Sequence, residues 1–172
     1  VFVMGNYLKF SRTLSQSPWE VEGKKLYETS IQEEIAKVVM PYYQPKDYKF
    51  HTGVIKLPLI KDLLYFSQGR EDIDVRMLGN GRPFVLEILD PKKSYSVSEE
   101  KLKEMEDIIN TNPLVNAVGL HYTDEKCFEV LKESETSKVK AYACVVVSEK
   151  EITQQDVDHL NSLREIKVRV FE

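Results

Sequence analysis

The chain has 172 residues, of which 42% are hydrophobic and 30% are charged, and its formal net charge is −4. This composition excludes fibrous and intrinsically disordered proteins, and the length allows one sizeable hydrophobic core. The acidic balance argues against broad nonspecific binding of nucleic acid, which depends mainly on neutralising phosphates. No apolar run approaches the roughly 18 residues that cross a bilayer, so no membrane partner is expected.

In residues 1–95 the sequence predicts one helix and three strands. Ser30 and Glu33 have the spacing of a capping box, and apolar residues follow at helical intervals until Pro41. Runs rich in Val, Ile, Tyr and Phe predict strands over Lys49–Ile55, Ile73–Leu78 and Phe84–Leu89. Between the last two runs, Asn80-Gly81 favours the two-residue turn of a hairpin.

In residues 96–172 strands and helices alternate. Ser96 and Glu99 again have capping-box spacing, and the helix that they begin is predicted to end at Asn112-Pro113. Its apolar stripe is formed by Leu102, Met105, Ile108 and Ile109. Shorter helices are predicted over Asp124–Lys132 and Gln154–Leu163, and strands over Val115–Tyr122, Tyr142–Val147 and Ile166–Phe171. This order predicts an α+β fold with a mixed or antiparallel sheet and helices packed on one face.

Neither a disulfide framework nor a metal site is expected. Cys127 and Cys144 lie far apart and outside any CxxC motif. His51, His121 and His159 have no metal-ligand spacing with each other or with the cysteines. The chain starts without an initiator Met or a signal-peptide layout, so we expect a soluble piece of a longer protein from a reducing, intracellular compartment.

The densest polar stretch of the chain runs over residues 69–84 and reads GREDIDVRMLGNGRPF. If a strand begins near Asp72, its two-residue period places Asp72, Asp74 and Arg76 on one face. An aspartate beside arginines stays ionised at neutral pH, as a nucleophile requires. The same pattern also fits an ion-pair lattice on a solvated strand and, less well, the paired carboxylates of a glycosidase.

A second candidate segment is KVKAYACV at residues 138–145. Strand alternation places Lys138, Lys140 and Tyr142 on one face. Two cations that lead to an aromatic ring are typical of a strand that contacts phosphates and stacks a base. The alternative interpretation is a half-buried strand tyrosine flanked by lysines whose stems lie along the surface.

The polar stretch at residues 69–84 resembles the active-site motif of the tRNA pseudouridine synthases that act on the T loop. Residues 5–12, GNYLKFSR, together with QSPW at residues 16–19, are similar to the first catalytic-domain motif of that family. The resemblance implies a pseudouridine synthase-type α+β fold, tRNA as the partner, isomerisation of uridine without metal or cofactor, and a location in the cytoplasm or nucleus. Residues 1–172 would form the N-terminal half of the catalytic domain, without the family's RNA-binding N-terminal domain, and would be inactive alone.

The resemblance also implies a role for each matching residue. Asp72 matches the aspartate of an Arg-x-Asp pattern and is the expected nucleophile, and Arg70 holds the flipped-out nucleotide. Tyr142 stacks on the target uracil and helps to transfer a proton. The expected RNA contacts are Lys9, Arg12, Arg76, Arg82, Lys138 and Lys140. Asn6 stands where the family is expected to carry a basic residue, and residues 52–68 are longer than the family requires.

Two other functions fit parts of the sequence. In a noncatalytic RNA-binding module, the basic residues Arg70, Arg76, Lys138 and Lys140 line a groove, and Asp72 only orients arginines. In a protein-interaction domain, the acidic later part of the chain contacts a partner through Glu99, Glu100 and Glu104.

Overall fold

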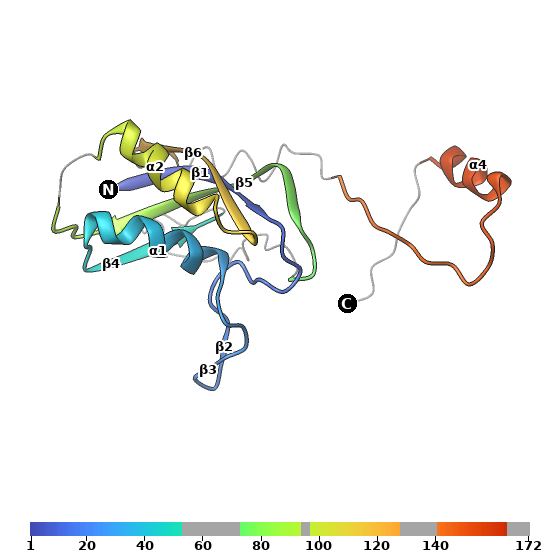
Figure 1. Ribbon diagram of the computed structural model, residues 1–172, viewed down its shortest axis with the longest axis horizontal. Helices are drawn as coiled ribbons and strands as arrows, with labels where there is room; N and C mark the ends of the chain where they lie inside the picture. Colours follow the sequence, from blue (N-terminus) through green and yellow to red (C-terminus); the bar gives the residue numbers. More distant parts are fainter. Residues whose placement is uncertain (53–72, 94–96, 128–140, 165–172) are drawn as a thin grey trace, which may run out of the picture. The chain divides into compact units, whose positions relative to one another are not determined.

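The computed structural model describes residues 1–52, 73–93, 97–127 and 141–164 (Figure 1). The chain divides into two units, Val1–Lys138 and Val139–Glu172. The first unit contains β1 (Phe2–Lys9), β2 (Glu20–Val21), β3 (Lys24–Lys25), α1 (Ile31–Tyr43), β4 (Asp47–His51), β5 (Met77–Leu89), α2 (Glu99–Ile109) and β6 (Val115–Thr123), and the second contains α4 (Gln154–Ser162). Over these described residues, no helix has the length and apolar character of a membrane span.

A four-stranded sheet in the order β4-β5-β1-β6 forms the centre of the first unit, and all neighbouring strands in it are antiparallel. Helices α1 and α2 cover one face of this sheet (Figure 1). Their apolar side chains share one core cluster with alternate residues of β1, β5 and β6. The structure therefore confirms the predicted α+β fold, with an antiparallel sheet and helices packed on one face.

Helix α1 begins where the capping box predicts it. The Ser30 side chain accepts a hydrogen bond from the Glu33 amide at 3.2 Å. The helix does not end at Pro41 but continues to Tyr43, whose ring is fully buried in the core. It stops at Gln44, which has a left-handed conformation with φ 46° and ψ 52°.

Helix α2 starts two residues later than the sequence predicts. Its N-cap is Ser98, which accepts from the Lys101 amide, whereas Ser96 lies outside the described residues. The predicted stripe is buried except for Ile108, which is exposed. In the second unit, α4 follows its prediction closely, because Thr153 and Asp156 form a capping box at its first turn.

The predicted hairpin at Asn80-Gly81 is wrong, because β5 runs through this position as one strand from Met77 to Leu89. Gly79 and Gly81 have φ of +66° and +74°, whereas the type I′ turn needs two consecutive residues of positive φ. Opposite this segment the register with β1 shifts, since Lys9 pairs with Met77 but Tyr7 pairs with Arg82. The residues between form a bulge within one long strand.

Other predicted strands differ in detail. Residues 73–75 form a turn before β5, so the strand predicted from Ile73 begins only at Met77. Val115–Tyr122 is confirmed as β6, and the strand predicted over Lys49–Ile55 is β4, although residues beyond 52 lie outside the described ones. The strand predicted over Tyr142–Val147 is wrong, because these residues have no regular secondary structure, and the described residues of their unit contain no strand to pair with them. The strand Ile166–Phe171 and most of the helix Asp124–Lys132 lie outside the described residues, although Cys127 is helical.

The bulge predicts different costs for two similar substitutions. A Cβ atom at Gly81 would lie 2.5 Å from the Tyr7 carbonyl oxygen, whereas one at Gly79 would meet nothing within 4 Å. Both glycines have positive φ, so Gly79→Ala should cost about 1 to 2 kcal/mol of unfolding free energy. Gly81→Ala should cost about 1 to 3 kcal/mol more, because β5 must also move away from β1. Urea denaturation of both variants measures this difference, and equal losses would contradict the close approach of the two strands.

Candidate active site

Lys9 is fully buried at the end of β1, although lysine is among the residues least often found in a protein core. Its ammonium donates hydrogen bonds to the carbonyl oxygens of Leu14 at 3.1 Å and Ile73 at 3.0 Å. Ile73 follows Asp72 directly in the chain. The side chain of Lys9 therefore joins the first polar motif to the segment that carries the expected nucleophile.

Two further side chains of the first motif reach the second one. The Arg12 guanidinium donates to the Asp74 carbonyl oxygen at 2.9 Å, and the Asn6 amide donates to the Asn80 carbonyl oxygen at 3.0 Å. These contacts link residues that are more than 60 positions apart in the chain. The two motifs that the sequence singles out are thus held together on the β1–β5 pair.

The side chains that lead into β5 keep the predicted alternation, although residues 73–75 form a turn and not a strand. Ile73, Val75 and Met77 are half-buried, whereas Asp74 and Arg76 are exposed. The carboxylate of Asp74 and the guanidinium of Arg76 are therefore open to solvent at this end of the sheet. Arg82, across from Tyr7 in the β1–β5 pair, is half-buried.

The remaining predicted site residues are not brought together by the described part of the structure. Asp72, Arg70, Lys138 and Lys140 lie outside the described residues. Tyr142 belongs to the second unit, where the residue is 79% exposed. Their roles stay predictions.

A buried polar network lies beneath the joined motifs, which the sequence did not reveal. The Gln16 side-chain amide donates from Nε2 to the Tyr7 hydroxyl at 2.8 Å, and the Thr52 hydroxyl donates to the Gln16 side-chain oxygen Oε1 at 3.1 Å. All three side chains are buried. Tyr7 also packs against Phe50 and Phe84, with ring centroids 6.4 and 6.3 Å away, and those two rings stack on each other. Gln16 is the first residue of the QSPW segment, and no local sequence pattern predicts that its side chain is buried.

The loop that carries Gln16 is fixed from its other side by α1. The backbone amide of Ile31 donates to the backbone carbonyl oxygen of Ser15 at 2.9 Å, and that of Gln32 donates to the backbone carbonyl oxygen of Gln16 at 3.0 Å. Amides of the first helical turn have no partner within the helix, so the loop completes their hydrogen bonding. The start of α1 and the end of β1 thus hold the loop between them.

His51 is engaged in an ion-pair cluster at the edge strand β4. Its Nε2 atom lies 2.9 Å from the Glu87 carboxylate, which also pairs with Lys49. Burial lowers the pKa of His51, and the neighbouring Glu87 offsets only part of this effect. In the described parts of the chain, no three His, Cys, Asp or Glu side chains gather in a way that would hold a metal ion.

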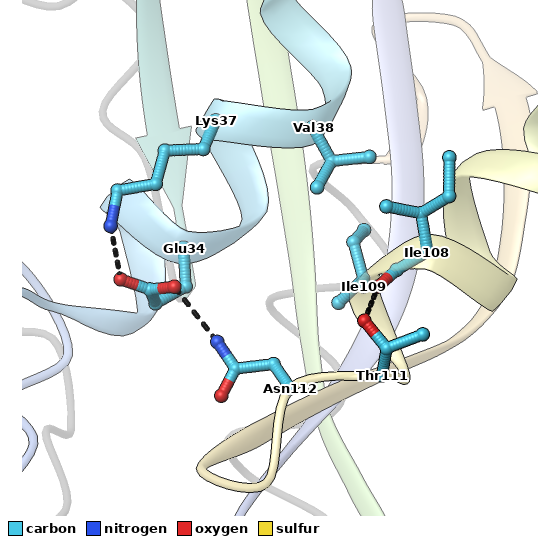
Figure 2. Close-up of a pocket in the computed structure, with 7 residues that line it drawn as sticks. All are labelled: Glu34, Lys37, Val38, Ile108, Ile109, Thr111 and Asn112. Atoms are coloured by element: carbon cyan, nitrogen blue, oxygen red, sulfur yellow. Dashed lines mark hydrogen bonds and ion pairs between the residues drawn. The ribbon is translucent and has the colours of Figure 1, made fainter.

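A shallow pocket of about 210 Å³ lies between α1 and α2 (Figure 2). Its lining residues are Glu34, Lys37, Val38, Ile108, Ile109, Thr111 and Asn112. Figure 2 shows the Glu34 carboxylate between Lys37 and Asn112, and the Asn112 amide donates to it at 2.8 Å. The Asn112–Glu34 hydrogen bond joins the turn after α2 to α1, so this polar group serves the contact between the two helices.

The sheet, the helices on one face and the two joined motifs define an α+β fold of the pseudouridine synthase type. Comparison with known proteins identifies the group more closely. The chain belongs to the family described as Pus10, C-terminal, whose model matches residues 2–170.

Curated relatives of the chain come from animals and archaea. The tRNA pseudouridine synthase Pus10 of Homo sapiens is 31% identical over 168 residues, which cover 98% of this chain and 29% of the relative. The protein of the same name from Archaeoglobus fulgidus is 36% identical over 185 residues, covering 98% and 45%. That from Thermofilum pendens is 35% identical over 166 residues, covering 95% and 33%. The chain therefore spans less than half the length of these relatives.

The polar network predicts an energetic coupling between Tyr7 and Gln16. Tyr7→Phe and Gln16→Leu should each destabilise the protein, because each leaves a buried polar group with fewer partners. The double variant should lose less than the sum of the two, with a coupling energy of about 0.5 to 3 kcal/mol. Urea denaturation of the four proteins measures the coupling. A control cycle of Tyr7→Phe with Ser98→Ala, at the exposed start of α2, should be additive, and additivity in both cycles would contradict the network.

Proposed function

We propose that the protein to which this chain belongs is a tRNA pseudouridine synthase that isomerises uridine in the T loop, with Asp72 as the nucleophile. One observation carries the proposal. The segment that directly follows Asp72 is held by Lys9 and Arg12 of the other family motif. Membership of the Pus10 C-terminal family supports the proposal, as do the names of the relatives.

The reaction requires that the protein position the nucleotide and supply one ionised carboxylate. The bond from ribose C1′ to N1 of uracil breaks, and a bond from C1′ to C5 forms. C5 loses a proton and N1 gains one, so the change is an isomerisation without oxidation or reduction. An Asp72 carboxylate can start it by attack at C1′ or at C6 of the base, or by removing a proton to give a glycal.

Before this chemistry, the target base must leave its stack, which costs a few kcal/mol. In our proposal Arg70 holds the flipped nucleotide and Tyr142 stacks on the uracil and helps to transfer a proton. Within the second unit Tyr142 is exposed, and an exposed aromatic side chain is the type that stacks on a base. The exposed Arg12 and Arg76, together with Arg82, Lys138 and Lys140, are the proposed RNA contacts.

The proposal assigns the chain to the first part of the catalytic domain of a longer protein. The chain covers 29% of its human relative and 45% of the archaeal one from Archaeoglobus fulgidus. We therefore propose that the chain is inactive alone and that the complete protein acts on tRNA in the cytoplasm or nucleus.

The assignment predicts that Asp72→Asn abolishes turnover by the full-length protein. Removal of a catalytic nucleophile costs about 10³-fold or more in kcat, whereas the neutral isostere keeps the shape of the site. Release of tritium from tRNA that carries 5-³H-uridine measures turnover, because C5 loses its hydrogen when the base is rejoined through that carbon. The binding of tRNA and the thermal unfolding of Asp72→Asn should match those of the parent.

Asp74→Asn is the matched control for this experiment, because Asp74 is two positions away and its side chain is exposed. It should release tritium at nearly the parent rate, since Arg12 contacts the backbone of Asp74 and not its carboxylate. Appreciable turnover by Asp72→Asn would contradict the assignment of the nucleophile. A folded parent that binds tRNA and releases no tritium would instead support the noncatalytic RNA-binding module.

A further inference from the structure

We propose that Lys9 is a positioning residue for the reaction and not an RNA contact, because its buried ammonium fixes the backbone directly after Asp72. The inference rests on the proposed function and adds to it a residue that sets the geometry of the nucleophile. It replaces the expectation that Lys9 contacts RNA.

The first argument is access. The alternating burial of β1 directs Lys9 to the same side of the strand as Val3 and Tyr7, which lie in the core. Lys9 is 0% exposed, so a phosphate group cannot approach its ammonium. The exposed Arg12, three residues further on, remains accessible to RNA.

The second argument is the cost of the buried charge. Moving an ammonium from water into a protein interior is unfavourable unless hydrogen bonds compensate for the lost hydration. An apolar residue at position 9 would avoid this cost. Carbonyl oxygens that Lys9 contacts lie on different segments, that of Leu14 in the loop after β1 and that of Ile73 in the turn before β5. One cation thus joins two segments that have little regular structure of their own.

The third argument is that contacts from Lys9 and Arg12 fix the backbone of the residues that follow Asp72. Lys9 holds the carbonyl group of Ile73, Arg12 holds that of Asp74, and Met77 pairs with Lys9 across the sheet. Consecutive Cα atoms are 3.8 Å apart, so the position of Ile73 limits where Asp72 can lie. A catalytic group displaced by about 1 Å can cost 100-fold in rate. Lys9 therefore acts on the reaction through the backbone and without contact with substrate.

The test compares Lys9→Met with the parent in the full-length protein. Methionine keeps the apolar length of the side chain and removes the ammonium. We expect kcat for tritium release to fall by about 100-fold, while the Kd for tRNA and its dependence on salt stay at the parent values. Hydrogen exchange in a peptide that covers residues 73–77 should become faster, and exchange in α2 should not change.

An RNA contact would behave in the opposite way. Loss of a phosphate-binding lysine would weaken tRNA binding, lower the salt slope by about 1 and leave kcat unchanged. That result would overturn the proposal, and so would an unchanged kcat with unchanged binding. Lys49→Met is the matched control, because Lys49 is an exposed lysine of the same sheet, and it should leave kcat and exchange at residues 73–77 unchanged.

A second variant covers the case in which Lys9→Met does not fold, as judged by circular dichroism and thermal unfolding. Lys9→Arg keeps the charge and the donors, but its planar guanidinium cannot reproduce the geometry of an ammonium between two carbonyl groups. A folded Lys9→Arg with lower kcat and the parent's tRNA affinity supports the proposal, whereas a parent-like kcat or weaker tRNA binding overturns it. Failure of the proposed function is recognised separately, because then the parent itself releases no tritium.

Discussion

The pairing of β1 with β5 is the constraint on which the rest of the first unit depends. β1 lies between β5 and β6, so it joins the two halves of the sheet. β5 must follow β1 closely enough that no Cβ atom fits at Gly81 beside the Tyr7 carbonyl group. Glycine at positions 79 and 81 allows the bulge that keeps the pairing on both sides of this point. The turn at residues 73–75 is thereby brought to the end of β1, where Lys9 and Arg12 contact it.

The core changes in character along β1. At its start, Val3 packs under the helices among apolar side chains. Further along, Tyr7 adds a hydroxyl that bonds to Gln16, and at its end Lys9 adds a full charge. Apolar packing tolerates small adjustments, whereas a buried polar group is costly unless its partners stand at hydrogen-bonding distance. The polar end of β1 therefore restricts the nearby backbone more tightly than the apolar end does, and this is the end at which the candidate site lies.

The elements that the sequence predicted well are those specified by nearby residues. Ser30 and Glu33 locate the start of α1, and the residues from Gln154 define α4, because capping and helical periodicity act within a few positions. Asn80-Gly81 misled because glycines of positive φ serve equally in a hairpin turn and in a bulge, and the choice depends on β1, more than 70 residues away. β1 itself was missed because it contains Gly5, Asn6 and Lys9, which are poor strand formers. Tyr142–Val147 shows the converse, since these strand-forming residues form no strand and have none to pair with among residues 141–164 of their unit.

Some features of the candidate site could likewise be predicted from the sequence, and others could not. The sequence showed its motifs and predicted the exposure of Asp74 and Arg76. It did not predict the burial of Lys9, because an isolated lysine in a sequence is typical of a solvated surface. The structure shows that both Lys9 and Arg12 direct hydrogen bonds at backbone carbonyl groups. In a chain whose net charge is −4, the buried charge of Lys9 contributes to holding the candidate segment and not to attracting a polyanion, whereas the exposed Arg12 is open to both uses. This use of charge fits the proposed isomerisation, in which one carboxylate must reach one flipped-out base. In that reaction the rate depends on how precisely the backbone next to the carboxylate is held in place.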